Sequence, residues 1–343
     1  MKKRVYIVYT GGTIGMKQVN GRYLPISNFL QELMAANPAF HHPDLPEYII
    51  HQYDPLFDSP DMSPSDWSKI ARDICDHYDE YDGFIVLHGT DTMAYTASAL
   101  AFMLKNLAKP VIVTGSQIPL CEIRSDAQDN LISALLLAAH DVIIPEVCLY
   151  FNSTLFRGCR AVKVDADGFD AFSSPNYPAL ATLGIGVEIQ RMLIQPMPAK
   201  AKLGIDLREI QQPGVVGAFR LFPGMSAQIF ANVLQPPLRG LVLETYGSGN
   251  GPTSNKSFVQ ALAEANARGV VIVNCTQCLS GTVDQSKYVT GAELEEVGVL
   301  SGYDMTPEAA LTKLAYLLSG NNSVARVKTL MQKNLRGELT EYW

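Results

Sequence analysis

The sequence lacks any apolar run long enough to cross a membrane, and it has little that would bind nucleic acid. Its longest apolar stretch, Leu131 to Ala139, falls far short of the roughly 20 residues that span a bilayer. Charged residues make up 18% of the 343 residues, the net charge is −7, and no basic run accompanies the aromatic residues. These features argue against a nucleic-acid groove, whereas 47% hydrophobic content is typical of a folded globular protein.

Cysteine and histidine are sparse, and their spacing forms neither a disulfide framework nor a metal site. Six cysteines in a chain of this length do not indicate a disulfide-stapled fold. Cys275 and Cys278 have the Cys-x-x-Cys spacing, which suits redox chemistry or half of a zinc site, but no second pair completes that site. We therefore expect two half-buried thiols after a strand, no metal and no cofactor.

The N-terminus begins like a signal peptide without completing one. Basic residues at positions 2–4 precede an apolar run, but a secretory segment needs about 7–15 apolar residues and a small-residue cleavage site. Here the run Val5–Tyr9 stops at Thr10, and no such cleavage site follows. We expect a cytoplasmic protein.

Strand-like and helix-like patterns alternate along the first half of the chain, which is typical of parallel sheets joined by crossover helices. The apolar runs predict strands at Arg4–Tyr9, Gly83–Leu87, Pro110–Thr114 and Glu146–Phe151. The intervening segments predict helices at Asp66–Tyr78, Thr92–Lys105 and Gln128–Ala139. The pattern indicates a doubly layered α/β domain.

The alternation breaks near residues 191–213, where prolines and lysines indicate a surface connector. It resumes with strands predicted at Val215–Phe222, Leu238–Thr245 and Val270–Asn274 and a capped helix at Thr306–Leu318. The predicted fold is α/β with two domains. Residues 1–190 form the larger N-terminal catalytic domain, with a parallel or mixed sheet and flanking helices; residues 191–213 form a linker, and residues 214–343 a smaller C-terminal parallel-sheet domain.

Polar clusters follow three of the predicted strands where each strand ends. They are Thr10–Thr13, His88–Thr92 and Thr114–Gln117. Ligands of open α/β sheets bind at the carboxyl ends of the strands. We therefore expect these three turns to assemble one site.

Thr13 is the first candidate nucleophile. Gly11 and Gly12 leave room for a substrate and permit a positive φ, and a threonine hydroxyl attacks once a base takes its proton. The alternatives are a helix cap or a phosphate-binding turn, although the turn matches neither glycine-rich nucleotide-binding pattern. Residues 16–25 hold too much glycine and proline for a helix and are predicted to be a mobile loop that carries Tyr23.

Thr90 and Asp91 form the second candidate cluster, directly ahead of a predicted helix. Backbone N–H groups at a helix N-terminus favour negative charge, so this turn suits a carboxylate or a developing oxyanion. Lys163 would complete a Thr–Lys–Asp proton relay, because a desolvated lysine beside a threonine can act as a base. The alternatives are that Asp91 caps the helix and that Lys163 is an ordinary solvated lysine.

A third polar cluster lies in a proline-punctuated turn at residues 58–64. Asp58 and Asp61 could bind an ammonium group there, and Ser59 could bind a carboxylate. The alternative is a solvated turn with a helix cap.

Taken together, Thr10–Ile14 and His88–Thr92 resemble the two signature motifs of the L-asparaginase/glutaminase amidohydrolase family. The Asp58–Met62 turn and Lys163 also sit where that family has them, and Asn334–Leu339 resembles its cytoplasmic, type I branch. The resemblance runs through nearly the whole chain. It implies a threonine amidohydrolase that converts L-asparagine and water to L-aspartate and ammonia.

The resemblance also implies catalytic roles. Thr13 would attack the side-chain amide and form a β-aspartyl ester, which water then hydrolyses. Thr90, Lys163 and Asp91 would relay protons, and Tyr23 would hydrogen-bond Thr13. Which group takes the proton from Thr13 in the first step is open between the Lys163 relay and Tyr23.

The same resemblance implies a substrate site shared between subunits of a homotetramer built as a dimer of dimers. Pro60 stands where many relatives have a donating side chain, so only its backbone could contribute. The implied substrate-binding residues are Asp58, Ser59, Pro60, Thr90, Asp91 and, contributed by a partner subunit, Asn250.

Some type I enzymes are activated by asparagine at a second site near residues matching Thr276 and Cys278, beside an arginine. Glu244 occupies the place of that arginine here, so the resemblance predicts weak or absent activation.

Three alternatives to an asparaginase are kept. The first is a glutaminase, because the one methylene that separates glutamine from asparagine is worth only ~1–3 kcal/mol of discrimination. The second is the amidase subunit of an archaeal tRNA-dependent amidotransferase, which we expect to need a further nucleic-acid-binding portion. The third is an inactive amino-acid-binding protein.

Overall fold

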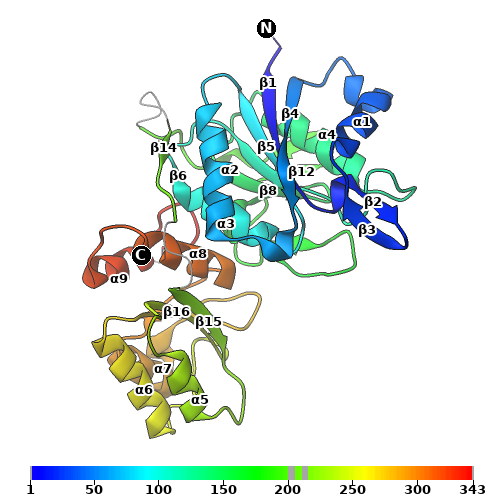
Figure 1. Ribbon diagram of the computed structural model, residues 1–343. Helices are drawn as coiled ribbons and strands as arrows, with labels where there is room; N and C mark the ends of the chain where they lie inside the picture. Colours follow the sequence, from blue (N-terminus) through cyan, green and yellow to red (C-terminus); the bar gives the residue numbers. More distant parts are fainter. Residues whose placement is uncertain (1, 200–204, 211–214, 342–343) are drawn as a thin grey trace. The chain divides into compact units, whose positions relative to one another are not determined.

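The computed structural model describes residues 2–199, 205–210 and 215–341. The chain divides into two units, Met1–Arg208 and Glu209–Trp343, whose elements are labelled in Figure 1. The predicted linker at 191–213 spans this division, and parts of it lie outside the described residues. The domain boundaries drawn from the sequence stay a prediction.

An eight-stranded sheet forms the centre of the first unit, in the order β13-β12-β9-β8-β7-β5-β1-β4. The parallel strands are β1 (Arg4–Gly11), β4 (Glu47–Phe57), β5 (Gly83–Leu87), β7 (Val111–Thr114) and β8 (Val147–Phe151). The antiparallel strands are β9 (Thr154–Arg157), β12 (Ala181–Leu183) and β13 (Val187–Ile189). The mixed sheet predicted for the larger domain is thereby confirmed.

Helices cover both faces of this sheet (Figure 1). Alternate side chains of β1 point to opposite faces, and Val5, Ile7 and Tyr9 pack in one cluster with buried residues of α1 and α4. The helices of this unit are α1 (Phe29–Ala36), α2 (Pro64–Asp76), α3 (Met93–Met103) and α4 (Ala127–Ala138). Burial on both faces explains why the central strands read as continuous apolar runs.

Strand β4, at the edge of the sheet, was not predicted. Its residues alternate between exposed and half-buried, so it has no continuous apolar run. It also contains Pro55, and a proline within a strand pattern usually argues against a strand. An edge strand tolerates proline because one side of its backbone has no strand partner.

The segment predicted to be a mobile loop, residues 16–25, forms regular structure, and its mobility stays a prediction. Residues Met16–Val19 (β2) and Arg22–Pro25 (β3) pair as an antiparallel hairpin. Asn20 and Gly21 form its turn with φ values of 52° and 79°. Asn-Gly is the preferred pair for a two-residue hairpin turn in which both residues take positive φ, and this signal outweighs the glycine and proline content of the segment.

Short elements complete the first unit and position several polar turns. Strand β10 (Val162–Lys163) pairs with β11 (Phe172–Ser173), and β6 (Leu104–Lys105) pairs with β14 (Asp206–Leu207). The 3₁₀ turns are η1 (Thr13–Gly15), η2 (Pro38–His41), η3 (Ser59–Asp61), η4 (Gly158–Arg160) and η5 (Arg191–Leu193).

The second unit is built on a parallel sheet in the order β15-β16-β17-β18, which confirms the predicted C-terminal sheet. Its strands are β15 (Val216–Arg220), β16 (Gly240–Thr245), β17 (Val271–Thr276) and β18 (Leu300–Ser301). Its helices are α5 (Ala227–Val233), α6 (Lys256–Ala267), α7 (Val289–Glu296), α8 (Pro307–Leu318) and α9 (Val324–Met331), with the 3₁₀ turn η7 (Gln285–Lys287).

A buried ion pair ties the C-terminal segment to α8. The Lys313 ammonium lies 2.5 Å from a carboxylate oxygen of Glu338, and both side chains are fully buried. It also donates to the carbonyl oxygens of Met331 at 2.9 Å and Lys333 at 2.6 Å. We call these groups the C-terminal clamp.

The two cysteines of the Cys-x-x-Cys pair lie in different surroundings. Cys275 is fully buried and Cys278 is exposed, so the expectation of two half-buried thiols is wrong. The difference arises because Cys275 still belongs to β17, whereas Cys278 follows its end. None of the described helices has the length and apolar character needed to cross a membrane.

Candidate active site

The polar turns after β4, β1 and β5 pack backbone against backbone. A Cβ on Gly11 would lie 2.2 Å from the Phe57 carbonyl oxygen, and one on Gly12 would lie 2.5 Å from the Gly89 nitrogen. A Cβ on Gly89 would lie 2.5 Å from the Ser59 hydroxyl oxygen. Since real Cβ atoms do not approach so closely, glycine is required at these contacts, and the three strand ends form one site.

Thr13 directly follows Gly12, is the first residue of η1, and is half-buried. The preceding Gly12 has φ 89°, a backbone conformation that favours glycine. Only a single 3₁₀ turn follows before β2 begins. Thr13 therefore does not cap an α-helix, and its side chain belongs to the turn itself.

Thr90, Asp91 and Lys163 lie within hydrogen-bonding distance of one another. The Lys163 ammonium donates to the Thr90 hydroxyl oxygen at 2.9 Å and to an Asp91 carboxylate oxygen at 2.7 Å. Thr90 is buried, the Lys163 side chain is 19% exposed and that of Asp91 is 60% exposed. A lysine withdrawn from water with a hydroxyl and a carboxylate as neighbours is able to pass protons to and from that hydroxyl.

The pairing of β10 with β11 is what delivers Lys163 to this position. Asp91 does not cap the following helix, because Thr92 is the N-cap residue of α3 and no side chain caps it. The Thr92 hydroxyl instead donates to the Ser59 carbonyl oxygen at 2.7 Å. Both alternatives weighed for this cluster, a capping aspartate and a solvated lysine, disagree with these contacts.

Gln117 links the Thr90 hydroxyl to the segment that follows Lys163. The Thr90 hydroxyl donates to the Gln117 side-chain oxygen at 3.1 Å, and the Gln117 amide nitrogen donates to the Gly168 carbonyl oxygen at 3.0 Å. The Asp126 carboxylate holds the Gln117 backbone, accepting from its N–H at 3.0 Å. The sequence pattern marks the end of this strand as a polar cluster but assigns Gln117 no role.

His88 supports the turn from below and is fully buried, so it is not a ligand-binding group. Its Nδ1 lies 2.7 Å from the Gly89 carbonyl oxygen and its Nε2 lies 2.8 Å from the Thr96 hydroxyl, which also accepts from Trp67 Nε1 at 3.0 Å. A carbonyl only accepts and an indole only donates. Nδ1 therefore carries the proton, and Thr96 donates to Nε2. Burial lowers the pKa of His88 to about 4, which keeps the ring neutral.

Tyr23 is not hydrogen-bonded to Thr13 in this structure. It lies in β3, is 44% exposed, and its hydroxyl donates to a Glu122 carboxylate oxygen at 3.4 Å. Partial desolvation, followed by the charge of Glu122, raises the pKa of the Tyr23 phenol, so its proton is harder to remove. The Thr13–Tyr23 hydrogen bond stays a prediction, and in this structure Glu122 provides the acceptor for Tyr23.

The turn after β4 divides into buried and exposed residues. Ser59 is 4% exposed and lies against Gly89, whereas Asp58, Pro60 and Asp61 are more open to solvent. The Asp58 side chain does not cap η3. The buried serine follows β4 and Thr13 follows β1, and these two strands are parallel neighbours.

Asn250 belongs to the second unit. Its side-chain oxygen accepts from the Thr290 hydroxyl at 2.8 Å, and its backbone pairs with Tyr246. Its contribution to the site stays a prediction.

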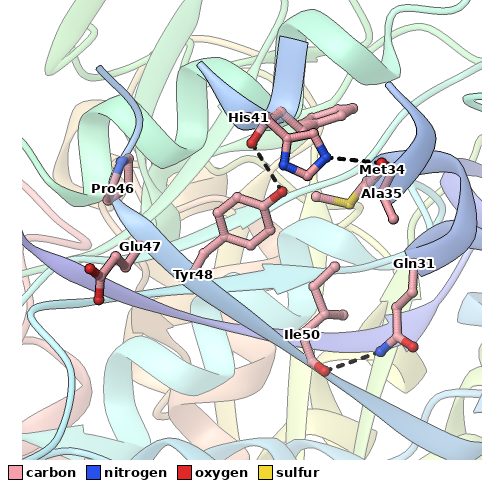
Figure 2. Close-up of a pocket in the computed structure, with 9 residues that line it drawn as sticks. Gln31, Met34, Ala35, His41, Pro46, Glu47, Tyr48 and Ile50 are labelled. Carbon is pink, nitrogen blue, oxygen red and sulfur yellow. Dashed lines mark hydrogen bonds between the residues drawn. The ribbon is translucent and has the colours of Figure 1, made fainter. Parts of the chain in front are cut away.

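Two other features bear on ligand binding. Among the described residues, no group of three or more histidine, cysteine, aspartate or glutamate side chains is placed to hold a metal ion. A cavity of about 460 Å³ lies between α1 and β4 (Figure 2). Three of its polar side chains bond to neighbouring backbone: Gln31 donates to the Ile50 carbonyl, Tyr48 to that of Phe40, and His41 to that of Ala35. We assign it no ligand.

Sequence reasoning missed the supporting residues Gln117, Asp126, Thr96 and Trp67. Each contact that they make depends on packing, as with Gln117, which is 27 positions from Thr90 and 51 from Gly168. No local spacing of residues in the sequence indicates such contacts. The one available signal is that Gln117 follows a strand whose neighbour delivers Thr90.

The sequence matches two family models, "Asparaginase, N-terminal" over residues 4–195 and "Glutaminase/Asparaginase C-terminal domain" over residues 215–331. It is 53% identical over 339 residues to L-asparaginase 1 of Escherichia coli strain K12, covering 99% of this chain and 98% of that protein. The crystal structure of L-asparaginase I from Vibrio cholerae superimposes with a TM-score of 0.91 and 49% identity, covering 99% of this chain and all of that one. A glutamyl-tRNA(Gln) amidotransferase component of Methanobrevibacter smithii is 32% identical over 352 residues, covering 99% of this chain and 78% of that protein.

Proposed function

Because the chain belongs to the asparaginase family, we propose that it hydrolyses L-asparagine to L-aspartate and ammonia. The observation that supports the proposal is the close packing of turns at three strand ends. Gly12, which precedes Thr13, lies against Gly89, which precedes Thr90, and Lys163 bonds to Thr90 and Asp91. A hydroxyl nucleophile, a proton relay and backbone donors in one turn are the parts that acyl transfer requires.

In the first step, the Thr13 hydroxyl attacks the side-chain amide carbon and forms a tetrahedral intermediate. Backbone N–H groups around Thr90 stabilise the oxyanion, which in other enzymes is worth about 3 kcal/mol for each donor. The intermediate collapses to a β-aspartyl ester as ammonia leaves with a proton from the relay. Water then attacks the ester and releases aspartate, with Thr90 and Lys163 taking and returning the proton.

The zwitterionic substrate explains the rest of the site. The α-ammonium needs an acid, and Asp91 with Asp58 supplies negative charge at the open edge of the sheet. The α-carboxylate needs donors, for which Ser59, the backbone at Pro60 and the N–H groups of the Thr90 turn are suited. The Lys163 relay is preferred over Tyr23 as the first base, because the Tyr23 hydroxyl is committed to Glu122 and its pKa is raised.

The proposal includes a cytoplasmic, type I enzyme that assembles as a homotetramer, a dimer of dimers. Asn250 of a partner subunit would complete each substrate site, so a dimer would be the smallest active form. The similarity to an L-asparaginase 1 over nearly the whole of both chains supports this assignment. An active, stable monomer at working concentration would contradict it.

The alternatives are separated by substrate. The higher identity to an L-asparaginase than to an amidotransferase component favours free asparagine over an aminoacyl-tRNA pathway. A glutaminase differs by one methylene, and an inactive binding protein would bind asparagine tightly without releasing ammonia. Catalytic candidates fill every position named above, which favours an enzyme.

Activation by asparagine at a second site is proposed to be weak or absent. The Glu244 carboxylate accepts from Arg220 at 3.2 Å, so this position presents an ion pair and not a lone cation. The rate should depend hyperbolically on asparagine concentration. A sigmoidal curve would contradict this part of the proposal.

The decisive experiment measures ammonia release from L-asparagine and, in parallel, from L-glutamine. Thr13→Val should abolish the asparagine activity, because valine keeps the shape and removes the nucleophile. Thr10→Val is the matched control, since the buried Thr10 hydroxyl is occupied with the Leu87 carbonyl at 2.8 Å, and it should retain most of the activity. Activity that survives Thr13→Val would move the nucleophile to Thr90, and an inactive parent would favour the binding-protein alternative.

A further inference from the structure

The hydrogen bonds around Thr90 fix the direction in which its hydroxyl proton points. Three groups meet there: the Lys163 ammonium at 2.9 Å, the Gln117 side-chain amide at 3.1 Å, and beyond it the Gly168 carbonyl at 3.0 Å from the amide nitrogen. Each of these groups can donate, accept or do both, and the combination admits only one consistent arrangement.

The Gly168 carbonyl determines which way round the Gln117 amide lies. A carbonyl oxygen accepts and never donates, so the –NH₂ end of Gln117 must face Gly168. The amide oxygen must then face Thr90. Asparagine and glutamine side chains are oriented by this kind of partner logic, and here the partner is a backbone group that cannot change its role.

Lys163 determines the other half of the arrangement. A protonated lysine has three donors and no acceptor, so the Thr90 oxygen accepts from Lys163 and its own proton must point elsewhere. The Gln117 oxygen is the acceptor that receives it. One lone pair of the Thr90 oxygen is left, and it is available to a hydroxyl or a water in the site.

Gln117 itself is held by an anchor that lies away from the reacting atoms. The Asp126 carboxylate accepts from the backbone N–H of Gln117 at 3.0 Å and of Ile118 at 3.0 Å, and from the Asn130 side chain at 3.1 Å. Charged acceptors make strong, short hydrogen bonds to backbone N–H groups. The position of the Gln117 amide is therefore set by the fold and not by the substrate.

We propose that Gln117 is a positioning residue, which holds the Thr90 proton away from Lys163 so that Thr90 receives a proton from the attacking hydroxyl or water. The inference rests on the proposed function. When Lys163 is neutral, Thr90 can donate either to Lys163 or to Gln117, and Gln117 competes for that proton.

The proton balance of the step is complete without any further reactant. The attacking O–H bond breaks as the new C–O bond forms, and its proton passes to the Thr90 oxygen. Lys163 enters this step as the neutral amine, after its ammonium has given one proton to solvent water. Thr90 then turns its own proton from Gln117 to this amine, which becomes an ammonium again. That proton then returns through Thr90 to the leaving ammonia or to the Thr13 oxygen.

Two variants at one position separate positioning from packing. Gln117→Met keeps the length and removes the acceptor, whereas Gln117→Glu keeps an acceptor and adds a negative charge. With Gln117→Met, kcat should fall by about three- to tenfold, the range expected for one neutral hydrogen bond, while KM changes by less than about twofold. Gln117→Glu should recover part of kcat but move the rise of activity with pH to higher pH.

A second readout does not depend on turnover. NMR follows the hydroxyl proton of Thr90, assigned by its loss in Thr90→Val. In the parent this proton should exchange slowly with water, because the Gln117 oxygen accepts it at 3.1 Å. The signal should be lost in Gln117→Met, which has no acceptor, and kept in Gln117→Glu.

Gln31→Met is the matched control, because Gln31 also donates to a backbone carbonyl, that of Ile50, in a region outside the site. It should leave kcat and the Thr90 hydroxyl signal unchanged. A parental kcat and a parental hydroxyl signal in Gln117→Met would overturn the inference, as would loss of the signal in both Gln117 variants. If the parent releases no ammonia, the proposed function fails, while the hydroxyl signal still decides the direction of the Thr90 proton.

Discussion

Two lysines of this protein have similar partners and opposite surroundings. Lys163 lies at the strand-end site and donates to the Thr90 hydroxyl and the Asp91 carboxylate. Lys313 lies in the C-terminal clamp and donates to two carbonyl oxygens and to Glu338. The Lys163 side chain is 19% exposed and its acid is 60% exposed, whereas both members of the clamp are fully buried.

The difference lies in what each acceptor can do with a proton. The carbonyl acceptors of Lys313 cannot give a proton back, and the Glu338 carboxylate is also committed to the backbone N–H groups of Leu335 and Arg336. Every one of these clamp contacts is thus fixed in its direction. Thr90, in contrast, carries a proton of its own, which can turn toward Lys163 or away from it. A lysine can carry protons when a neighbouring group can exchange protons with it. When none of its neighbours can do so, the lysine only stabilises the structure.

The largest expected effect tests the strand-end lysine. Lys163→Met should lower kcat by about 10³-fold, within the range for losing a general acid–base group, and change the free energy of unfolding little. Ammonia release and urea unfolding measure the two quantities. Lys105→Met is the control, since Lys105 is also paired with an aspartate, at 2.8 Å from Asp206, but lies in β6. A strongly unfolded Lys163→Met protein with normal specific activity would reverse the comparison.

The second effect tests the clamp. Lys313→Met should lower the free energy of unfolding by about 3–5 kcal/mol, because removing one partner leaves the Glu338 charge buried and unpaired. Folded protein should keep its kcat. The double variant Lys313→Met/Glu338→Leu should be more stable than Lys313→Met alone, since no buried charge is left. Equal stability of Lys313→Met and the parent would show that the Lys313–Glu338 pair does not stabilise the fold.

Acid should lower the stability of the protein through His88, whose buried ring is uncharged at neutral pH. The pKa of His88 is lowered from 6.5 to about 4 by burial, so between these values the unfolded chain binds the proton and the folded chain does not. Stability therefore rises with pH across this window and is lost as pH falls through it, by roughly 3 kcal/mol in full. Urea midpoints between neutral pH and the lower end of this window measure the slope.

His88→Asn should flatten this part of the pH dependence, because an asparagine retains a donor for the Gly89 carbonyl and does not titrate. His42→Gln, which changes an exposed histidine, should leave the slope as it is in the parent. The same slope in His88→Asn and in the parent would show that other groups cause it.

The central strands were predictable because a strand buried on both faces is written as an apolar run, as in Gly83–Leu87, which forms β5. The edge strand β4 was not, because its exposed residues and Pro55 hide it. Of the candidate site, the polar turns at the ends of the strands were predictable from the sequence. The Lys163–Thr90 contact spans 73 positions of the chain. Chemical reasoning suggested Lys163 as part of a relay, and the family resemblance pointed to the same lysine. Physical reasoning alone could not exclude an ordinary solvated lysine, because such contacts depend on how distant segments pack.

The smallest expected effect concerns the Tyr9 hydroxyl in β1, which has no hydrogen-bond partner among the described residues. The Tyr9 hydroxyl is buried beneath η1, where it fills the space of a side chain at Gly15: a Cβ there would lie 1.9 Å from it. Burial raises the pKa of Tyr9, in keeping with a neutral hydroxyl that has left water without a hydrogen bond in return. Tyr9→Phe should therefore raise the free energy of unfolding by about 1 kcal/mol, with kcat unchanged. Tyr6→Phe is the opposed control, because the Tyr6 hydroxyl donates to Asp73 at 2.9 Å and its loss should destabilise the fold. A loss of stability in Tyr9→Phe would mean that this hydroxyl has a partner, such as a buried water, and that the strand-end region is as fully satisfied as the clamp.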